Sequence, residues 1–66
     1  MTEDEELQAQ LAERLEEHRD LDTAISALED ALIHDQLKIR RLKKRKLALK
    51  DIIFQIEDQL LPDIIA

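Results

Sequence analysis

A seven-residue repeat of Leu and Ile runs from Leu7 to Leu60, and it limits the possible fold more than any other feature. Setting heptad position a at Leu11 assigns sixteen core positions, and twelve of them are Leu or Ile. The four exceptions are polar, namely Arg14, His18, Asp35 and Lys46. A heptad repeat maintained over this length is typical of helices packed as a coiled coil. We therefore predict an all-α fold.

The composition argues against several classes of function. The 66 residues include no cysteine and no glycine, which excludes disulfides, thiolate metal sites and glycine-rich phosphate loops. Phe54 is the single aromatic residue, so a surface that stacks nucleic-acid bases is not expected. No stretch approaches the roughly 20 apolar residues of a membrane span, and the acidic start does not resemble a secretory signal. We expect a cytoplasmic protein with no membrane span and no cofactor.

Signals for helix ends divide the chain in two. Thr2 and Glu5 form a capping-box pattern at the start, and Pro62 ends the helical region. Asp35 is polar at a core position and is a good N-cap for a second helix. The prediction is a single helical domain with helix 1 over about 3–33, a turn over about 33–36, helix 2 over about 36–61 and a short tail over 62–66.

The distribution of charge favours antiparallel pairing of the two helices. Residues 1–35 carry twelve acidic and two basic residues, net −10, whereas residues 36–66 carry four acidic and eight basic residues, net +4. Only antiparallel pairing lays the basic stretch beside the acids of the first half. A helical hairpin gives these contacts, and so do two continuous helices that cross near residue 34, the domain-swapped equivalent. We prefer the hairpin, although the heptad phase passes through Leu32 unbroken and leaves the continuous helix open.

Leu47, Phe54 and Leu61 form a second apolar stripe at a spacing of seven, outside the core positions, and Ile52 and Leu37 add further apolar surface. A hairpin covers only one face of each helix, so this stripe would be exposed in an isolated chain. Exposed apolar stripes generally mark an oligomer interface or a site for a partner protein. We expect a homo-oligomer, in the simplest case a dimer of hairpins, or binding of another protein.

The basic run from Arg40 to Lys46 has two interpretations. Its charges could bind the phosphates of a nucleic acid. They could also neutralise the acidic first helix, and the overall acidity of the chain, with a pI near 4.7, favours this second interpretation.

Side chains that could carry chemistry are few. His18 and Asp22, one helical turn apart, are half of a metal site at most, and a hydrogen-bonded imidazole that fixes register is the preferred interpretation. Ser26 has no neighbouring histidine to activate it. A pair of helices also offers no closed pocket that could shift pKa values. We therefore expect no catalytic residue, no metal ion and no enzymatic activity.

Two stretches carry a resemblance to a known family. They read His18-x-x-Leu21-Asp22-x-x-Ile25 and Arg41-Leu42-Lys43-Lys44-x-Lys46-Leu47-x-Leu49-Lys50-Asp51-x-Ile53. Over roughly residues 14–57 the chain resembles the YdcH-like family of small bacterial proteins, a domain of unknown function. The resemblance implies a short two-helix coiled coil of the bacterial cytoplasm. It marks as family-pattern positions His18, Asp22, Lys43, Lys44, Lys46, Lys50 and Asp51.

In an antiparallel hairpin, Lys46 and Lys50 pass close to Asp22. We therefore hypothesise that Asp22 pairs with one of these lysines and fixes the register of the helices. The function we predict is that of a non-enzymatic coiled-coil scaffold, adaptor or regulatory subunit that acts through protein–protein contacts. The alternative is a nucleic-acid-associated protein that uses Arg40–Lys46, and the sequence names no partner or pathway.

Overall fold

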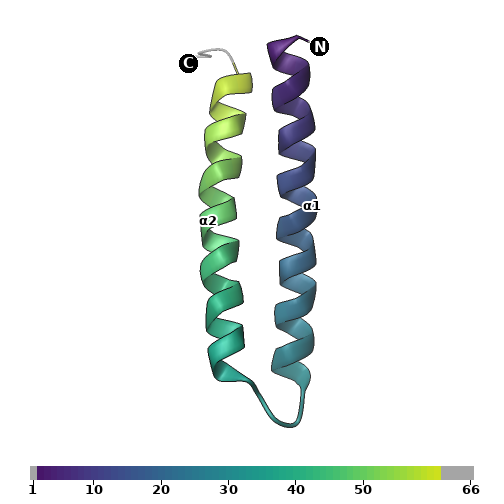
Figure 1. Ribbon diagram of the computed structural model, residues 1–66, viewed down its shortest axis with the longest axis vertical. Coiled ribbons are helices and arrows are strands. Elements are labelled where there is room, and N and C mark those ends of the chain that lie inside the picture. The colour runs from purple at the N-terminus through teal and green to yellow at the C-terminus, as the bar shows by residue number, and fades with distance from the viewer. Residues whose placement is uncertain (1, 62–66) are drawn as a thin grey trace.

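A computed structural model describes residues 2–61 of the chain as two α-helices. Helix α1 spans Glu3–Asp30 and helix α2 spans Gln36–Leu60. Figure 1 shows them side by side and antiparallel, so that the start of α1 and the end of α2 lie at the same end of the molecule. The predicted all-α helical hairpin is confirmed. Neither helix has an apolar stretch long enough to cross a membrane in the part of the chain described.

The start of α1 is held by the predicted capping box. The Glu5 backbone N–H donates a 3.2 Å hydrogen bond to Thr2 Oγ1, and the Thr2 backbone N–H donates a 3.2 Å hydrogen bond to Glu5 Oε1. These bonds satisfy backbone donors that have no partner within the helix. Four acidic residues in the first turn also interact favourably with the positive end of the helix dipole.

The turn is longer than the sequence predicted, because α1 ends at Asp30 rather than at about residue 33. Ala31 adopts an extended conformation, with φ −68° and ψ 148°, and this directs the chain away from the helix axis. Asp35 then caps α2 as predicted, since its Oδ1 accepts a 3.0 Å hydrogen bond from the Lys38 backbone N–H.

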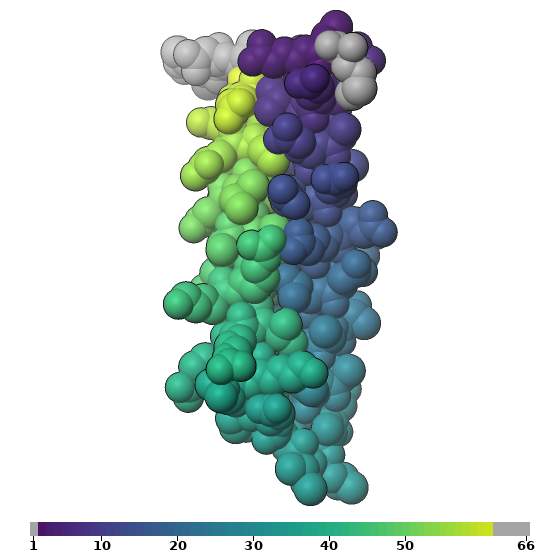
Figure 2. All heavy atoms as spheres, viewed as in Figure 1, coloured from purple at the N-terminus to yellow at the C-terminus, as the bar shows by residue number. Residues whose placement is uncertain are grey.

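Leu32 was assigned to the core by the heptad repeat, and the structure shows that this assignment is wrong. It lies in the turn and is fully exposed, and its neighbour Ile33 is 89% exposed. The heptad describes side-chain direction only where the backbone is helical, so the phase carries no meaning once the chain becomes extended at Ala31. Figure 2 shows the turn projecting beyond the two helices at the foot of the molecule.

The core lies along the predicted seam and is narrow. Among residues 2–61, five apolar side chains are buried, and Leu49 is the most deeply covered at 0% exposure. All five occupy heptad positions a or d, and they are Ile25, Ile39, Leu49, Ile53 and Ile56. The remaining seam positions within the helices are half-buried. No polar or charged side chain in the described range is buried, because those on the seam extend toward solvent.

Candidate functional site

The basic run of α2 lies against acidic residues of α1. Lys46 Nζ is 2.6 Å from Asp22 Oδ1, and Lys43 Nζ is 3.2 Å from Glu29 Oε2. Lys46 is the charged side chain that interrupts the apolar seam of α2, and its ammonium reaches Asp22 at the edge of the core. The hypothesised pairing of Asp22 with a lysine of α2 is therefore present, with Lys46 rather than Lys50 as its partner.

A third contact between the helices joins Arg45 to Glu17. Glu17 Oε1 accepts hydrogen bonds from Arg45 Nη2 at 2.8 Å and from Arg45 Nε at 3.2 Å. Arg14, one turn earlier on α1, lies 3.4 Å from the other oxygen of the same carboxylate. The guanidinium hydrogen bonds of Arg45 and its positive charge, with a smaller contribution from Arg14, hold the pKa of Glu17 below its ordinary value.

Asp22 also has two basic side chains beside its carboxylate, Lys46 and His18. The hydrogen bond from Lys46 is the main cause that lowers the pKa of this carboxyl, and attraction to His18 adds to it. His18 Nδ1 lies 3.6 Å from Asp22 Oδ2, which is too long for a hydrogen bond. His18 is half-buried as predicted for a seam position, with 27% of its side chain exposed, but the predicted hydrogen bond of its imidazole is not present in the described part of the chain. Residues 2–61 contain no cluster of three or more acidic or histidine side chains that could hold a metal ion.

The other family-pattern residues on α2 face solvent. Lys44, Lys50 and Asp51 are all exposed. Lys50 Nζ lies 5.8 Å from the centre of the Phe54 ring, within the range of a cation–π contact. Within residues 2–61, none of these three side chains takes part in the ion pairs that join the helices.

Apolar side chains outside the core gather on one face of the hairpin. Leu47, Phe54 and Leu61 are 62%, 56% and 63% exposed, as a stripe outside the seam requires. Leu15 of α1, 43% exposed, lies with Leu47 and Phe54 in one groove. We call these four residues the groove face. Ile52, predicted to add to the exposed surface, is half-buried.

Three shallow, open grooves connect these residues. One groove lies between the helices and is lined by Leu15, His18, Lys46, Leu47, Lys50, Ile53 and Phe54. A second shares Phe54 with it and continues along α2 to Leu61. A third shares Leu61 with the second and returns to α1 at Leu11. Neighbouring grooves thus share lining residues, Phe54 in one case and Leu61 in the other.

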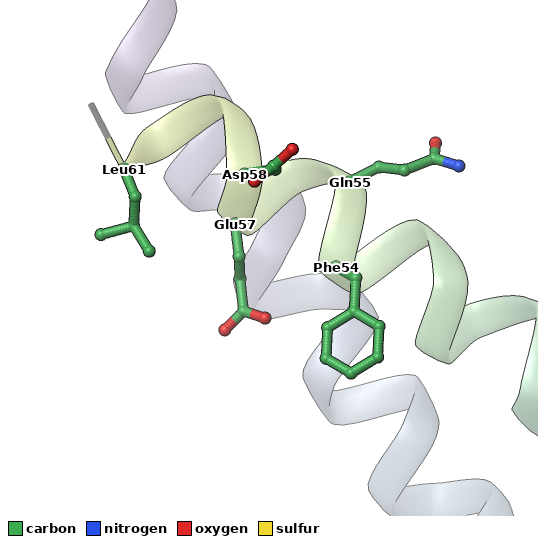
Figure 3. Close-up of a pocket in the computed structure, with 5 residues that line it drawn as sticks. All are labelled: Phe54, Gln55, Glu57, Asp58 and Leu61. Carbon is green, nitrogen blue, oxygen red and sulfur yellow. The ribbon is translucent and has the colours of Figure 1, made fainter. Parts of the chain in front are cut away.

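The side chains around the second groove leave α2 in two directions. Figure 3 shows Phe54, Glu57 and Leu61 projecting to one side, and Gln55 and Asp58 projecting away from it. An acidic residue, Glu57, therefore lies beside the apolar stripe, between Phe54 and Leu61 along the helix.

Leu15 was not predicted from the sequence to be part of this surface. Leu15 lies four residues after Leu11, on the flank of the α1 seam. A flank position is covered only when the opposing helix presents a bulky side chain there, and the two-helix arrangement leaves this one partly open. Its spacing from Leu11 could have indicated a second apolar flank beside the seam.

The family described as protein of unknown function (DUF465) matches residues 11–57, which is most of the sequence. The chain belongs to the DUF465 family. This is the YdcH-like domain, so the resemblance noted in the sequence is confirmed. No curated protein and no solved structure matched the chain.

The DUF465 match includes most of the surface described above. Leu15, Leu47 and Phe54 fall inside it, as do the three ion pairs described above, whereas Leu61 falls just beyond its end. The family description gives no activity.

Proposed function

We propose that this DUF465 protein is a non-enzymatic scaffold, adaptor or regulatory subunit that acts through protein–protein contacts on the groove face. The observation that carries the proposal is the exposure of large apolar side chains beside a small core. Five are buried within residues 2–61, while the four of the groove face are each at least 43% exposed and line neighbouring grooves. Contiguous apolar surface of this kind is typical of interaction sites.

The size of the hairpin supports the same proposal. A chain of this length buries a small core, and its stability is usually completed by a disulfide, a metal ion or an additional protein surface. Cysteine is absent from the sequence, so a disulfide is excluded. A protein surface laid on the groove face would cover Leu47 and Phe54 and extend the narrow core. That surface belongs to a second copy of the chain, to another protein, or to both.

The lack of enclosed polar groups supports a non-enzymatic role. Catalytic acids and bases are usually tuned by burial, and no polar side chain of residues 2–61 is buried. The grooves are open and shallow, so they offer little exclusion of water from a reacting group.

The ion pairs between the helices make nucleic-acid binding the weaker alternative. Lys43, Arg45 and Lys46, three of the six cations in the run from Arg40 to Lys46, lie against carboxylates of α1. A phosphate would have to compete with these carboxylates for the same charges.

A comparison of two surface variants tests the proposal. Phe54→Asp places a charge on the groove face, and Leu37→Asp does so at a leucine of the same helix with nearly the same exposure, 55%, outside that face. We expect the wild-type chain and Leu37→Asp to co-purify with the same identified protein, or to self-associate, and Phe54→Asp to do neither. Both variants should retain the helical circular dichroism spectrum. Equal behaviour of the two folded variants would contradict the proposal.

A further inference from the structure

The apolar stripe on α2 is symmetric about its central residue. Leu47 and Leu61 each lie seven residues from Phe54, which places them about 10 Å from it along the helix in opposite directions. A two-fold axis perpendicular to α2 at Phe54 therefore brings the stripe onto itself in the reverse direction. In that arrangement Leu47 of one copy lies beside Leu61 of the other, and the two phenylalanine rings meet at the axis.

The charges on the inner flank of the stripe match under the same rotation. Lys50 precedes Phe54 by four residues and Glu57 follows it by three, so the two occupy the same heptad position on the side of the groove between the helices. Lys50 extends over the Phe54 ring at 5.8 Å, and Glu57 projects on the same side as Phe54 (Figure 3). The rotation places Lys50 of each copy beside Glu57 of the other, which gives two complementary pairs.

The charges on the outer flank of the stripe indicate from which side a second copy of the chain can approach α2. Asp51 and Asp58 share one heptad position there, and Figure 3 shows Asp58 projecting away from Phe54 and Leu61. A copy that approached over this flank would bring carboxylates of like charge together, which is unfavourable. The inner flank offers the complementary pairs and the additional apolar surface of Leu15 in the groove between the helices.

We propose that the groove face binds a second copy of this chain, as an antiparallel two-fold dimer of hairpins centred on Phe54. This rests on the proposed function and names the partner of the same surface. An isologous contact of this kind uses the face of each copy once and closes at two copies. Its centre is an aromatic side chain surrounded by leucines with charges at the rim, the arrangement usual for the residues that contribute most to binding.

The first test measures the mass of the full chain in solution over a range of concentrations. Sedimentation equilibrium should show reversible association from 7.7 kDa to twice that mass and no further. Phe54→Asp should raise the dissociation constant about tenfold or more, and Leu37→Asp should leave it unchanged. A wild-type chain that stays monomeric at hundreds of micromolar, or a Phe54→Asp chain that dimerises as well as wild type, would overturn the proposal.

Charge reversal tests the two-fold arrangement. Lys50→Glu brings two acidic residues together at each pair, and Glu57→Lys brings two basic residues together, so each variant alone should dimerise more weakly than wild type. Mixed in equal amounts, the two variants restore both pairs and should form a heterodimer in preference to either homodimer. If mixing gives no preference, Lys50 and Glu57 do not meet in the dimer and the proposed geometry is wrong.

Disulfide cross-linking then tests the orientation, because the chain has no cysteine of its own. An oxidised mixture of Leu47→Cys and Leu61→Cys should give a disulfide between the two variants, whereas each variant alone should give little cross-linking. Efficient cross-linking of each variant to itself would indicate parallel stripes and overturn the antiparallel dimer.

The proposed function and this inference fail in different ways. If the wild-type chain is monomeric but Phe54→Asp selectively loses a purified, identified partner, the second copy is rejected and the interaction surface stands. If Phe54→Asp changes neither the mass of the protein nor the binding of a partner, both are rejected.

Discussion

Lys46 Nζ lies 2.6 Å from Asp22 Oδ1 and joins the charged core position of α2 directly to an acidic residue of α1. A lysine at a core position of a coiled coil costs stability but restricts the alignments that the helices can adopt. A shift of α2 along α1 by one heptad would place this ammonium opposite Leu15 in one direction and opposite Glu29 in the other. The pair with Asp22 therefore provides a physical reason against the first of these shifts.

Replacing Asp22 with Asn tests this role. The variant keeps the shape of the side chain and removes its charge, so Lys46 loses its ionic partner at the edge of the core. We expect a lower melting temperature, by less than a large core truncation would cause, or a change in solution mass. A double-mutant cycle with Lys46→Met isolates the pair, since an interaction between the two residues makes the single effects non-additive. Additive effects, with melting and mass unchanged in Asp22→Asn, would contradict a role in register.

The lowered pKa values of Glu17 and Asp22 predict a loss of stability in acid. Both carboxyls have folded-state pKa values below their ordinary values of 4.5 and 3.8, so the unfolded chain binds protons more readily than the folded one. Their contribution is present above those ordinary values and is lost as the pH falls through the lower folded-state values. Urea unfolding at fixed protein concentration should show this decline. The double variant Glu17→Gln/Asp22→Asn should lose less stability over the same interval, and an identical decline would reject these two groups as its source.

Leu49 should be the most sensitive position in the core, because it is the side chain with 0% exposure. Leu49→Ala should reduce the free energy of unfolding by about 2–5 kcal/mol, the range for truncating a buried leucine. A loss of that size is comparable with the whole stability of a chain this small, so the variant should be largely unfolded by circular dichroism. Leu37→Ala is the matched control and should change the stability by less than about 0.5 kcal/mol. Similar losses in both variants would show that Leu49 is not buried as described.

The buried positions and the helix caps of this hairpin could be predicted from the sequence. The repeat identified Leu49, Ile53 and the other buried positions, because helical backbone fixes the direction of every side chain along it. Thr2 and Asp35 were recognised as caps, since their side chains bond to backbone groups only three residues away. Both features depend on short-range geometry that a sequence specifies directly.

Features that depend on where a helix ends, or on how the two helices lie relative to each other, were harder to predict from the sequence. The exposure of Leu32 follows from the extended conformation of Ala31, and no glycine or proline near that position signals it. The place of Leu15 in the groove face depends on which side chains of α2 lie beside it, here Leu47 and Phe54. The choice of Lys46 over Lys50 as the partner of Asp22 likewise required the relative position of the helices.

The exposed turn gives a test that separates the hairpin from a swapped pair of continuous helices. Leu32 is fully exposed in the hairpin, so Leu32→Asp should change the free energy of unfolding by less than about 0.5 kcal/mol. In a continuous helix the same residue would occupy a core position, and a buried carboxylate there would be strongly destabilising. Chemical denaturation of wild type and variant measures the difference. A large loss of stability, with a change in solution mass, would favour the swapped arrangement.

Binding to nucleic acid should be weak and limited to low salt. Lys43, Arg45 and Lys46 already interact with carboxylates of α1, and the chain carries a net charge of −6 that repels phosphates. Fluorescence anisotropy with a short labelled duplex should show no binding at about 150 mM salt, and any low-salt binding should fall steeply as salt is added. Glu29→Gln releases Lys43 and should strengthen that low-salt binding. Submicromolar affinity at physiological salt, abolished by replacing Arg40 and Arg41 with Gln, would instead establish the basic run as a nucleic-acid site.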